Sequence, residues 1–214
     1  MKIFLFLIIP ILLIIAGYFI YHLVINKNKT EQNGSIPNTS SQTPQQTSVP
    51  ETAFTFPIEQ FKERITKKPF GIYITPKNSP VSPEKFSGYH AGVDVEYTDI
   101  AEDVPVYAIS DGKVVLSKTA SGYGGVFMIE IIIDSKPHTV LYGHIRPSNL
   151  PKIGQAVKKG EKIAILGTGY SAETDGERKH LHFAVLSDNS LNILGYVQNK
   201  SELSSWIGPL SLYK

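Results

Sequence analysis

The chain has 214 residues, of which 42% are hydrophobic and 19% are charged, and its formal net charge is +2. A charge this close to zero gives no electrostatic reason to expect a nucleic-acid partner, and we predict none. The absence of cysteine excludes a thiol nucleophile, a cysteine-ligated zinc site and a disulfide framework.

The N-terminal segment is predicted to be a membrane anchor. Residues 3–25 are almost continuously apolar, which is long enough for a helix to cross a bilayer. A cleavable signal peptide has a shorter apolar core and a small-residue cleavage site, and the region of Ala16-Gly17 offers no good one. We therefore predict an uncleaved, single-pass transmembrane anchor over residues 1–25.

A linker is predicted to follow the anchor. Residues 26–53 are rich in Asn, Gln, Ser, Thr and Pro and show no apolar period, so they cannot bury enough surface to fold. As a flexible coil, such a disordered segment would separate its ends by about 30 Å. It would hold a folded domain, predicted over residues 54–214 with a core at about 86–188, away from the membrane.

The folded domain is predicted to contain one or two short helices. Ile58, Phe61 and Ile65 recur at helical spacing near its start. A second short helix is predicted over 201–206, and Trp206 is expected to cover the core rather than bind a ligand.

Short strand-like runs dominate the rest of the domain. Asp111-Gly112 and Lys159-Gly160 have the composition of hairpin turns. Several short strands at this spacing predict an all-β fold, mainly an antiparallel sandwich or barrel. The predicted strands are Val104–Ile109, Lys113–Ser117, Val126–Ile133, Thr139–Gly143, Lys162–Leu166 and Leu181–Leu186.

Four histidines and one aspartate stand out in three short motifs. Imidazole nitrogen and carboxylate oxygen are normal zinc ligands, and a catalytic zinc keeps three protein ligands and one open position. On an extended chain, both the first and the last motif would place their two polar residues on one face. Residue chemistry predicts a zinc site but leaves open which histidines bind the metal. The motifs are His90-Ala-Gly-Val-Asp94, Tyr142-Gly143-His144 and His180-Leu181-His182.

The two remaining histidines are predicted to lie outside this site. His138 follows a Ser-Lys-Pro sequence typical of a turn, so we expect an exposed loop residue. His22 lies near the end of the apolar N-terminal segment and is expected at the membrane interface.

The three motifs resemble those of the lysostaphin-type (LytM-type) zinc endopeptidases, which cut bacterial cell-wall peptides. In that family the first motif is His-x-x-x-Asp, the last is His-x-His, and a further histidine lies between them. The resemblance implies that His90, Asp94 and His182 bind Zn²⁺, and that His144 and His180 form an unligated catalytic pair. It also implies a two-sheet β fold of the duplicated hybrid motif type, with the site in an open groove.

The function implied by the resemblance is that of a membrane-anchored zinc metalloendopeptidase. It would hydrolyse peptide bonds in peptidoglycan stem peptides or cross-bridges, and we expect it to act as a monomer. The alternative is a non-catalytic peptidoglycan-binding module that anchors or activates another hydrolase. In the family that behaviour accompanies lost ligands, and all five positions are filled here.

Membrane orientation is a point of conflict. Lys27 and Lys29 outnumber Lys2, so the positive-inside rule favours a cytoplasmic C-terminal domain. The expected substrate lies outside the cell membrane, and on that ground we predict an extracytoplasmic domain.

The connection that leads into the His-x-His motif departs from the family pattern. Residues 169–179 form a longer Gly-to-His connection than is common in that family. We expect this loop to form part of a groove wall and to affect substrate choice, because loops on a rigid scaffold carry specificity. The alternative is a solvated excursion. The charged residues expected to face a passing peptide are Glu173, Asp175, Glu177, Arg178 and Lys179.

Overall fold

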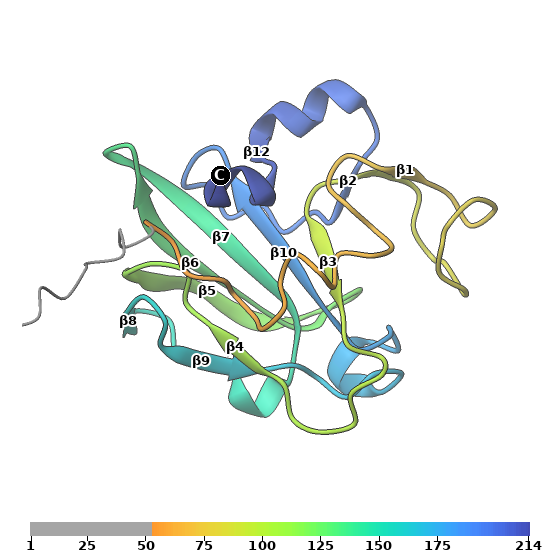
Figure 1. Cartoon of the computed structure of the whole chain (residues 1–214), viewed down its shortest axis with the longest axis horizontal. Coiled ribbons are helices and arrows are strands. Elements are labelled where there is room, and N and C mark those ends of the chain that lie inside the picture. Colours follow the sequence, from red (N-terminus) through yellow and green to blue (C-terminus); the bar gives the residue numbers. More distant parts are fainter. Residues whose placement is uncertain (1–52) are drawn as a thin grey trace, which may run out of the picture. The chain divides into compact units, whose positions relative to one another are not determined.

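A computed structural model describes residues 53–214, which form part of one compact unit (Figure 1). This part of the chain contains twelve short or medium strands, four 3₁₀ helices and no α-helix. Every pairing between its strands is antiparallel, so the predicted all-β, mainly antiparallel class is confirmed for the described residues.

The strands are β1 (Tyr73–Ile74), β2 (Gly88–His90), β3 (Val93–Glu96), β4 (Pro105–Tyr107), β5 (Gly112–Ala120), β6 (Gly124–Ile133), β7 (Lys136–Ile145), β8 (Ala156–Val157), β9 (Lys162–Ile165), β10 (His180–Leu186), β11 (Tyr196–Val197) and β12 (Trp206–Ile207). The 3₁₀ helices are η1 (Pro147–Asn149), η2 (Ala172–Thr174), η3 (Lys200–Ser205) and η4 (Pro209–Tyr213).

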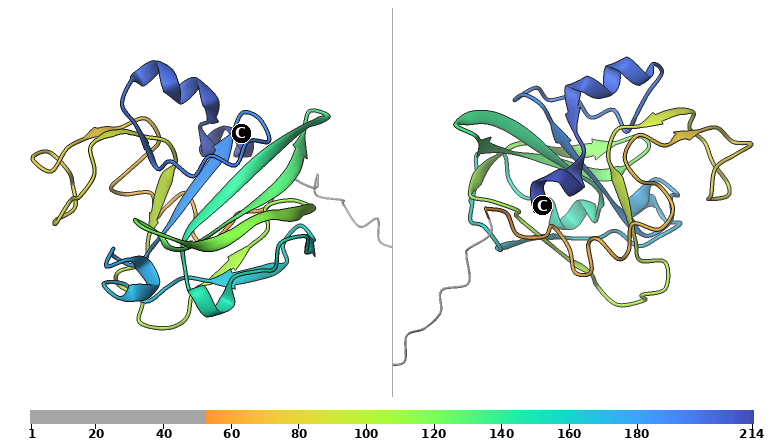
Figure 2. Two further views of the ribbon diagram at one scale, coloured as in Figure 1. Left: turned by 180° about the vertical axis from the view of Figure 1, so that it is seen from behind. Right: turned by 45° about the horizontal axis from the view of Figure 1, so that its top comes forward.

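The strands form three sheets instead of the two that the resemblance implied. The largest has the order β12-β10-β7-β6-β5-β8, and β3 also pairs with β10. A three-stranded sheet has the order β1-β2-β11, and β4 pairs with β9. The β1–β2 region lies at the opposite end of the domain from β8 in every view (Figures 1 and 2).

Strand β10 is the centre of the large sheet. It is buried at each of its seven positions. One edge pairs with β7, and the other edge pairs first with β3 and then with β12. Its alternate residues Leu181, Phe183 and Val185 point into the larger apolar core. Alternation therefore places His180 and His182 on the opposite face, as the sequence predicted.

The larger core fills the space between the large sheet and the β4–β9 pair. Phe127 and Tyr142 stack there with ring centroids 4.6 Å apart, and Phe61 meets Phe183 edge to face. A smaller apolar cluster covers the other face of the sheet and includes Trp206, which is 7% exposed. The prediction that Trp206 covers the core is confirmed.

The predicted helix around Ile58, Phe61 and Ile65 is wrong. Residues 59–64 form turns, although Ile58 and Phe61 are fully buried against the larger core. Their spacing therefore reflects burial against the sheets and does not indicate an α-helix. The second short helix is present as η3, in 3₁₀ form.

The two predicted hairpin turns are also wrong. The strands before and after Asp111-Gly112, β4 and β5, do not pair with each other, and neither do β8 and β9 around Lys159-Gly160. Each turn instead carries the chain from one sheet to another. Gly160 has φ +78, a conformation typical of glycine in a turn. The turn at this residue is therefore present, but it does not close a hairpin.

The predicted anchor, the linker and His22 lie outside the described residues. Within residues 53–214, no helix is both long and apolar enough to span a bilayer.

Candidate metal centre

The pairing of β3 with β10 brings the first and last sequence motifs together. In this ladder Asp94 lies directly opposite His182, and Glu96 lies opposite His180. Directly opposed residues on one face of an antiparallel pair have their Cβ atoms roughly 5 Å apart, which is close enough for side-chain contact. The backbone register itself therefore brings the side chains of Asp94 and His182 within contact distance.

His90 reaches the site from a different sheet. It is the last residue of β2, whereas Asp94 belongs to β3. Ala91 and Gly92 separate the two strands. His90 and Asp94 therefore do not share a face of one extended strand, which corrects the prediction from sequence, although the two side chains do converge. A Cβ atom on Gly92 would lie 2.6 Å from the Phe183 carbonyl oxygen, so only glycine permits this close approach to β10.

Three ligand-type atoms face one another at the meeting point. His90 Nε2 lies 3.1 Å from His182 Nδ1 and 3.2 Å from Asp94 Oδ1, and His182 Nδ1 lies 3.0 Å from the same oxygen. All three residues are buried.

This donor set fits a zinc ion. Ligands at 2.0–2.1 Å in a tetrahedral arrangement are separated by roughly 3.3 Å, close to the three separations found here. The other ring nitrogen of His90, Nδ1, is 3.3 Å from the Pro69 carbonyl oxygen, so His90 can carry its proton there and keep a lone pair at Nε2. Burial opposes the ionisation of Asp94, but its electrostatic interactions with His180, His90 and Arg178 outweigh burial and hold the Asp94 pKa well below its usual range.

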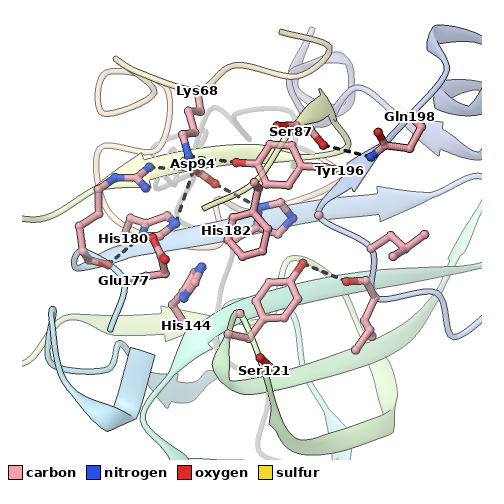
Figure 3. Close-up of a pocket in the computed structure, with 17 residues that line it drawn as sticks. Lys68, Ser87, Asp94, Ser121, His144, Glu177, His180, His182, Tyr196 and Gln198 are labelled. Atoms are coloured by element: carbon pink, nitrogen blue, oxygen red, sulfur yellow. Dashed lines mark hydrogen bonds and ion pairs between the residues drawn. The ribbon is translucent and has the colours of Figure 1, made fainter. Parts of the chain in front are cut away.

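His144 and His180 lie beside these atoms. Their ring centroids are 4.1 Å apart, and Figure 3 shows the His144 ring beside that of His180 at the pocket. His180 Nδ1 donates to the Arg178 carbonyl oxygen at 2.8 Å, and its Nε2 lies 3.5 Å from Asp94 Oδ2. The buried Nδ1 of His144 has no hydrogen-bond partner among the described residues.

A β-bulge turns His144 toward the site. The register between β6 and β7 shifts so that Gly125 pairs with Ile145 and Val126 pairs with Gly143, which leaves His144 as the extra residue. Its backbone has φ +62, in the left-handed region. Such a bulge re-aims a side chain, and here it puts His144 on the same face of the sheet as His180.

Burial lowers the pKa of three histidines of the site and so favours their neutral form. It lowers the pKa of His144 to about 3, and it lowers the pKa of His180 and His182 as well. For all three rings the negative charge of Asp94 acts in the opposite direction.

These side chains open into a pocket of about 320 Å³. Tyr123, Tyr196 and Phe86 supply aromatic walls, and the Phe86 and Tyr196 rings stack 5.5 Å apart. The Tyr196 hydroxyl accepts a hydrogen bond from Lys68 Nζ at 3.0 Å, and Tyr123 donates to the Ile193 carbonyl oxygen. Figure 3 places Tyr196 beside Asp94 and His182.

The charged side chains of the pocket are paired within the protein. Lys68 Nζ lies 2.6 Å from Glu84, and Glu177 lies 3.0 Å from Lys85. Arg178 bonds to the carboxylates of Asp94 and Glu96. The pocket wall thus presents aromatic rings and polar groups more than free charge.

The loop over residues 169–179 packs into the domain. Thr174 is fully buried, Arg178 is 4% exposed, and Lys179 Nζ donates to the carbonyl oxygens of Ile100 and Glu102. A Cβ atom on Gly124 would overlap the Glu173 carbonyl oxygen, which shows how closely β6 approaches this loop. The expectation that all five loop charges face a peptide is therefore wrong, and so is a fully solvated excursion.

The loop does contribute to the pocket wall, as expected, through Glu177 and Arg178. Sequence reasoning did not find Lys68 and Tyr196, which come from distant segments without a shared motif. Arg178 was expected only as one of the loop charges that face a passing peptide. Its position two residues before His180 on an extended chain is the signal that would have placed it on the site's face.

His138 differs from its prediction. It lies in β7 and is 8% exposed, and its Nδ1 is 2.9 Å from the Leu186 carbonyl oxygen. The turn signal of the preceding residues belongs to the β6–β7 hairpin, where Asp134 and Ser135 have positive φ. His138 is a satisfied structural histidine and has no contact with the site.

Comparison with known proteins gives the chain a family. Residues 88–193 match the model of Peptidase family M23. The chain is 33% identical over 99 residues to the uncharacterized lipoprotein YgeR of Escherichia coli, covering 46% of this chain and 35% of that protein. It is 37% identical over 95 residues to an uncharacterized metalloprotease of Haemophilus influenzae, covering 44% of this chain and 18% of that one. The chain thus spans only about a third or less of the curated relatives it matches.

Among solved structures, a zinc containing peptidase from Vibrio cholerae is similar, with 27% identity and a TM-score of 0.39 over 62% of this chain and 36% of that one. The family match covers all five residues of the three motifs, from His90 to His182, and the chain belongs to Peptidase family M23.

Proposed function

We propose that this protein is a zinc-dependent endopeptidase that hydrolyses peptide bonds in peptidoglycan stem peptides or cross-bridges. The observation that carries the proposal is the triangle of His90 Nε2, Asp94 Oδ1 and His182 Nδ1, with edges of 3.0 to 3.2 Å, beside an unligated histidine pair. These three residues would hold Zn²⁺. When bound, zinc lowers the pKa of a coordinated water and polarises the scissile carbonyl.

Proton transfer is assigned to His180. Its Nδ1–H is held by the Arg178 carbonyl oxygen, so its Nε2 keeps a lone pair that can accept a proton. Asp94 Oδ2, at 3.5 Å from that nitrogen, favours the protonated ring. The proton that Nε2 would take from the attacking water would pass to the leaving amine as the scissile C–N bond breaks, which would complete the reaction.

His144 is assigned to the developing oxyanion. Its ring lies against that of His180 and lines the pocket, and its buried Nδ1 has no hydrogen-bond partner within residues 53–214. In its Nδ1–H form the ring would donate to the carbonyl oxygen in the transition state.

The pairing of the charged wall residues bears on the substrate. Because Lys68, Glu177 and Arg178 already have partners, a charged side chain next to the scissile bond would find no ready counter-charge in the pocket. This favours cleavage between uncharged residues of the wall peptide.

A single assay tests the activity. Purified full-length chain is incubated with peptidoglycan, and new amino termini are counted with and without a chelator, then after zinc is returned. We expect chelator-sensitive release that zinc restores. Binding to peptidoglycan without new amino termini would instead identify the chain as a non-catalytic module that anchors or activates another hydrolase.

The cellular location is part of the same proposal. A peptidoglycan substrate requires the domain to lie outside the cell membrane, tethered by the apolar segment of residues 3–25 and the polar linker that follows. A monomer suffices, because one chain supplies all five site residues.

A further inference from the structure

We propose that Arg178 is a positioning residue that locks the carboxylate of Asp94, so that Oδ1 stays turned toward His90 and His182. The inference rests on the proposed zinc site. It goes beyond it by giving a function to a residue outside the three motifs, located in the long connection before the His-x-His strand.

The guanidinium of Arg178 joins two carboxylates of strand β3. Nη2 donates to Asp94 Oδ2 at 2.7 Å and to Glu96 Oε1 at 2.7 Å, and Nε donates to Glu96 Oε2 at 2.9 Å. The side chains of all three residues are at most 8% exposed. Charge-assisted hydrogen bonds that are this short and this buried strongly restrict the groups that make them.

The two oxygens of Asp94 consequently face different partners. Oδ1 lies 3.2 Å from His90 Nε2 and 3.0 Å from His182 Nδ1, whereas Oδ2 is occupied by Arg178. Rotation of the carboxylate about its Cβ–Cγ bond would break the bond at Oδ2 and turn Oδ1 away from the two imidazoles. Arg178 therefore converts a side chain with a soft terminal torsion into a ligand with one orientation.

Only an arginine can make this bridge. The planar guanidinium presents several donors in fixed directions, whereas a lysine ammonium is a single point charge on a flexible stem. Lysine at this position could neutralise one carboxylate but could not hold Asp94 and Glu96 together in the same geometry.

Arg178 touches the site through its backbone as well. Its carbonyl oxygen accepts from His180 Nδ1 at 2.8 Å. A substitution at position 178 removes the guanidinium and keeps this carbonyl group, so the two contributions can be separated by mutation.

A purely structural explanation is that Arg178 only neutralises buried charge. Glu96 receives most of its hydrogen bonds and lies 4.0 Å from Lys67, so the Arg178–Glu96 pair could serve stability alone. In that case the removal of either partner should have the same consequence for the metal. If Arg178 positions Asp94, the two removals should differ.

The experiment compares Arg178→Lys with Glu96→Gln in the full-length chain. Zn²⁺ affinity is measured by competition with a chromogenic chelator, the visible spectrum of the Co²⁺-loaded protein reports ligand geometry, and the melting temperature is recorded. We expect Arg178→Lys to weaken Zn²⁺ binding by about 10- to 100-fold, the usual effect of losing a partner that orients a ligand, and to alter the Co²⁺ spectrum. Glu96→Gln keeps the Arg178–Asp94 bond and should stay within about threefold of the wild type.

A double variant covers the case in which Arg178→Lys does not fold. Arg178→Met combined with Glu96→Leu removes both charges of the side pair with little change of volume, which buried ion pairs often tolerate. It should show the same loss of Zn²⁺ affinity, because Asp94 Oδ2 lacks its hydrogen bond from Arg178 in this variant as well. Unchanged affinity in the folded Arg178 variants, or an equal loss in Glu96→Gln, would overturn the inference.

The metal readout keeps this inference distinct from the proposed activity. A wild-type chain that binds Zn²⁺ and fails to cut peptidoglycan would contradict the peptidase proposal while the Arg178 comparison still stands. A wild-type chain that binds no Zn²⁺ would overturn both. Cleavage of peptidoglycan by the wild type with normal Zn²⁺ affinity in Arg178→Lys would overturn only the role of Arg178.

Discussion

His144 reaches the site only because β7 bulges at that residue. Without the extra residue, strand alternation would place His144 on the same face of the sheet as Tyr142, which lies in the larger core. A left-handed backbone at a residue other than glycine costs of order 1 kcal/mol or more and persists where the surroundings enforce it. Its occurrence at a pocket histidine is in keeping with a functional role.

Replacement of either unligated histidine should separate chemistry from metal binding. In His144→Ala and His180→Ala, the atoms of the His90, Asp94 and His182 triangle are untouched. We expect both variants to keep Zn²⁺ and to lose about 100-fold or more in the rate of peptidoglycan cleavage, the scale of a positioned acid or base. Metal content and initial rates of release of amino termini are the measurements.

His138→Ala is the matched control for this pair. It removes a buried histidine whose ring hydrogen-bonds to the Leu186 carbonyl oxygen, so it should lower the melting temperature and leave the rate unchanged at 25 °C. Loss of Zn²⁺ from His180→Ala, with retention in His182→Ala, would reverse the assignment of the two residues on β10.

Gly92 should be the most sensitive glycine for metal binding. A methyl group there would lie 2.6 Å from the Phe183 carbonyl oxygen and 3.0 Å from the His182 ring, and the chain that joins His90 to Asp94 would have to move. We expect Gly92→Ala to weaken Zn²⁺ binding by tenfold or more. The measurement is chelator competition, and the control is Gly208→Ala, where the nearest atom would be a Phe70 ring carbon at 3.4 Å. Equal affinities in the two variants would contradict this expectation.

Sequence spacing accounts for only part of the arrangement of the candidate site's side chains. His180 and His182 alternate on one strand, and period-two spacing was sufficient to place them. His90 and Asp94 converge from two sheets, and His144 depends on a bulge; neither is encoded in local spacing. Arg178 was hidden among the polar residues of a loop, since its burial depends on contacts with β3.

The connection from β1 to β2 and the loop over residues 169–179 contact each other beside the pocket. Lys85, in the connection from β1 to β2, binds Glu177 at 3.0 Å and the Asp175 carbonyl oxygen at 3.1 Å. The Asp175 carboxylate in turn accepts from the Gly122 backbone N–H at 2.7 Å. Three segments far apart in sequence therefore form one connected rim around the pocket.

The buried pair of Lys68 and Glu84 fixes the first of these loops, and its strength should depend on pH. Burial acts to raise the Glu84 pKa, but hydrogen bonds from Lys68, Ser79 and the Phe86 backbone N–H outweigh it and lower that pKa below its usual value. A carboxyl group whose folded pKa is lowered stabilises the fold above its unfolded pKa, about 4.3, and loses that contribution as the pH falls through the folded value.

Glu84→Gln should therefore lower the free energy of unfolding by about 3 kcal/mol at pH 7, the usual cost of breaking a buried ion pair. Its difference from the wild type should shrink as the pH falls below about 4. Denaturant unfolding at several pH values is the measurement, with Glu59→Gln at an exposed site as control. A difference that stays constant with pH would show that ionisation of Glu84 is not the cause.

Elements were predictable from sequence where the signal was local. Each of the six predicted strands overlaps an observed one, because alternation and β-branched residues mark them. The partners of those strands were not predictable: both supposed hairpin turns lead from one sheet to another. The prediction of a helix near Ile58 was wrong because Ile58 and Phe61 are buried by tertiary contacts, which do not require a helix.

The topology of the whole chain can be tested directly. If residues 3–25 form an anchor and the domain lies outside, protease added to intact spheroplasts should digest the domain. The measurement is an immunoblot against the C-terminal part, and a cytoplasmic protein serves as the control for lysis. Protection until the membrane is broken would show that Lys27 and Lys29 set the orientation.

The site also joins parts of the domain that differ in how firmly they are held. Strand β10 is hydrogen-bonded on both edges and wholly buried, so its amide hydrogens should exchange only when the entire domain opens. Strand β2, which carries His90, has three residues, and its partners within residues 53–214 are the two-residue strands β1 and β11. On heating, β2 should open first and release His90 while Asp94 and His182 remain in place. Inactivation by heat should thus begin as a reversible loss of one metal ligand, at temperatures where most of the sheet still resists exchange.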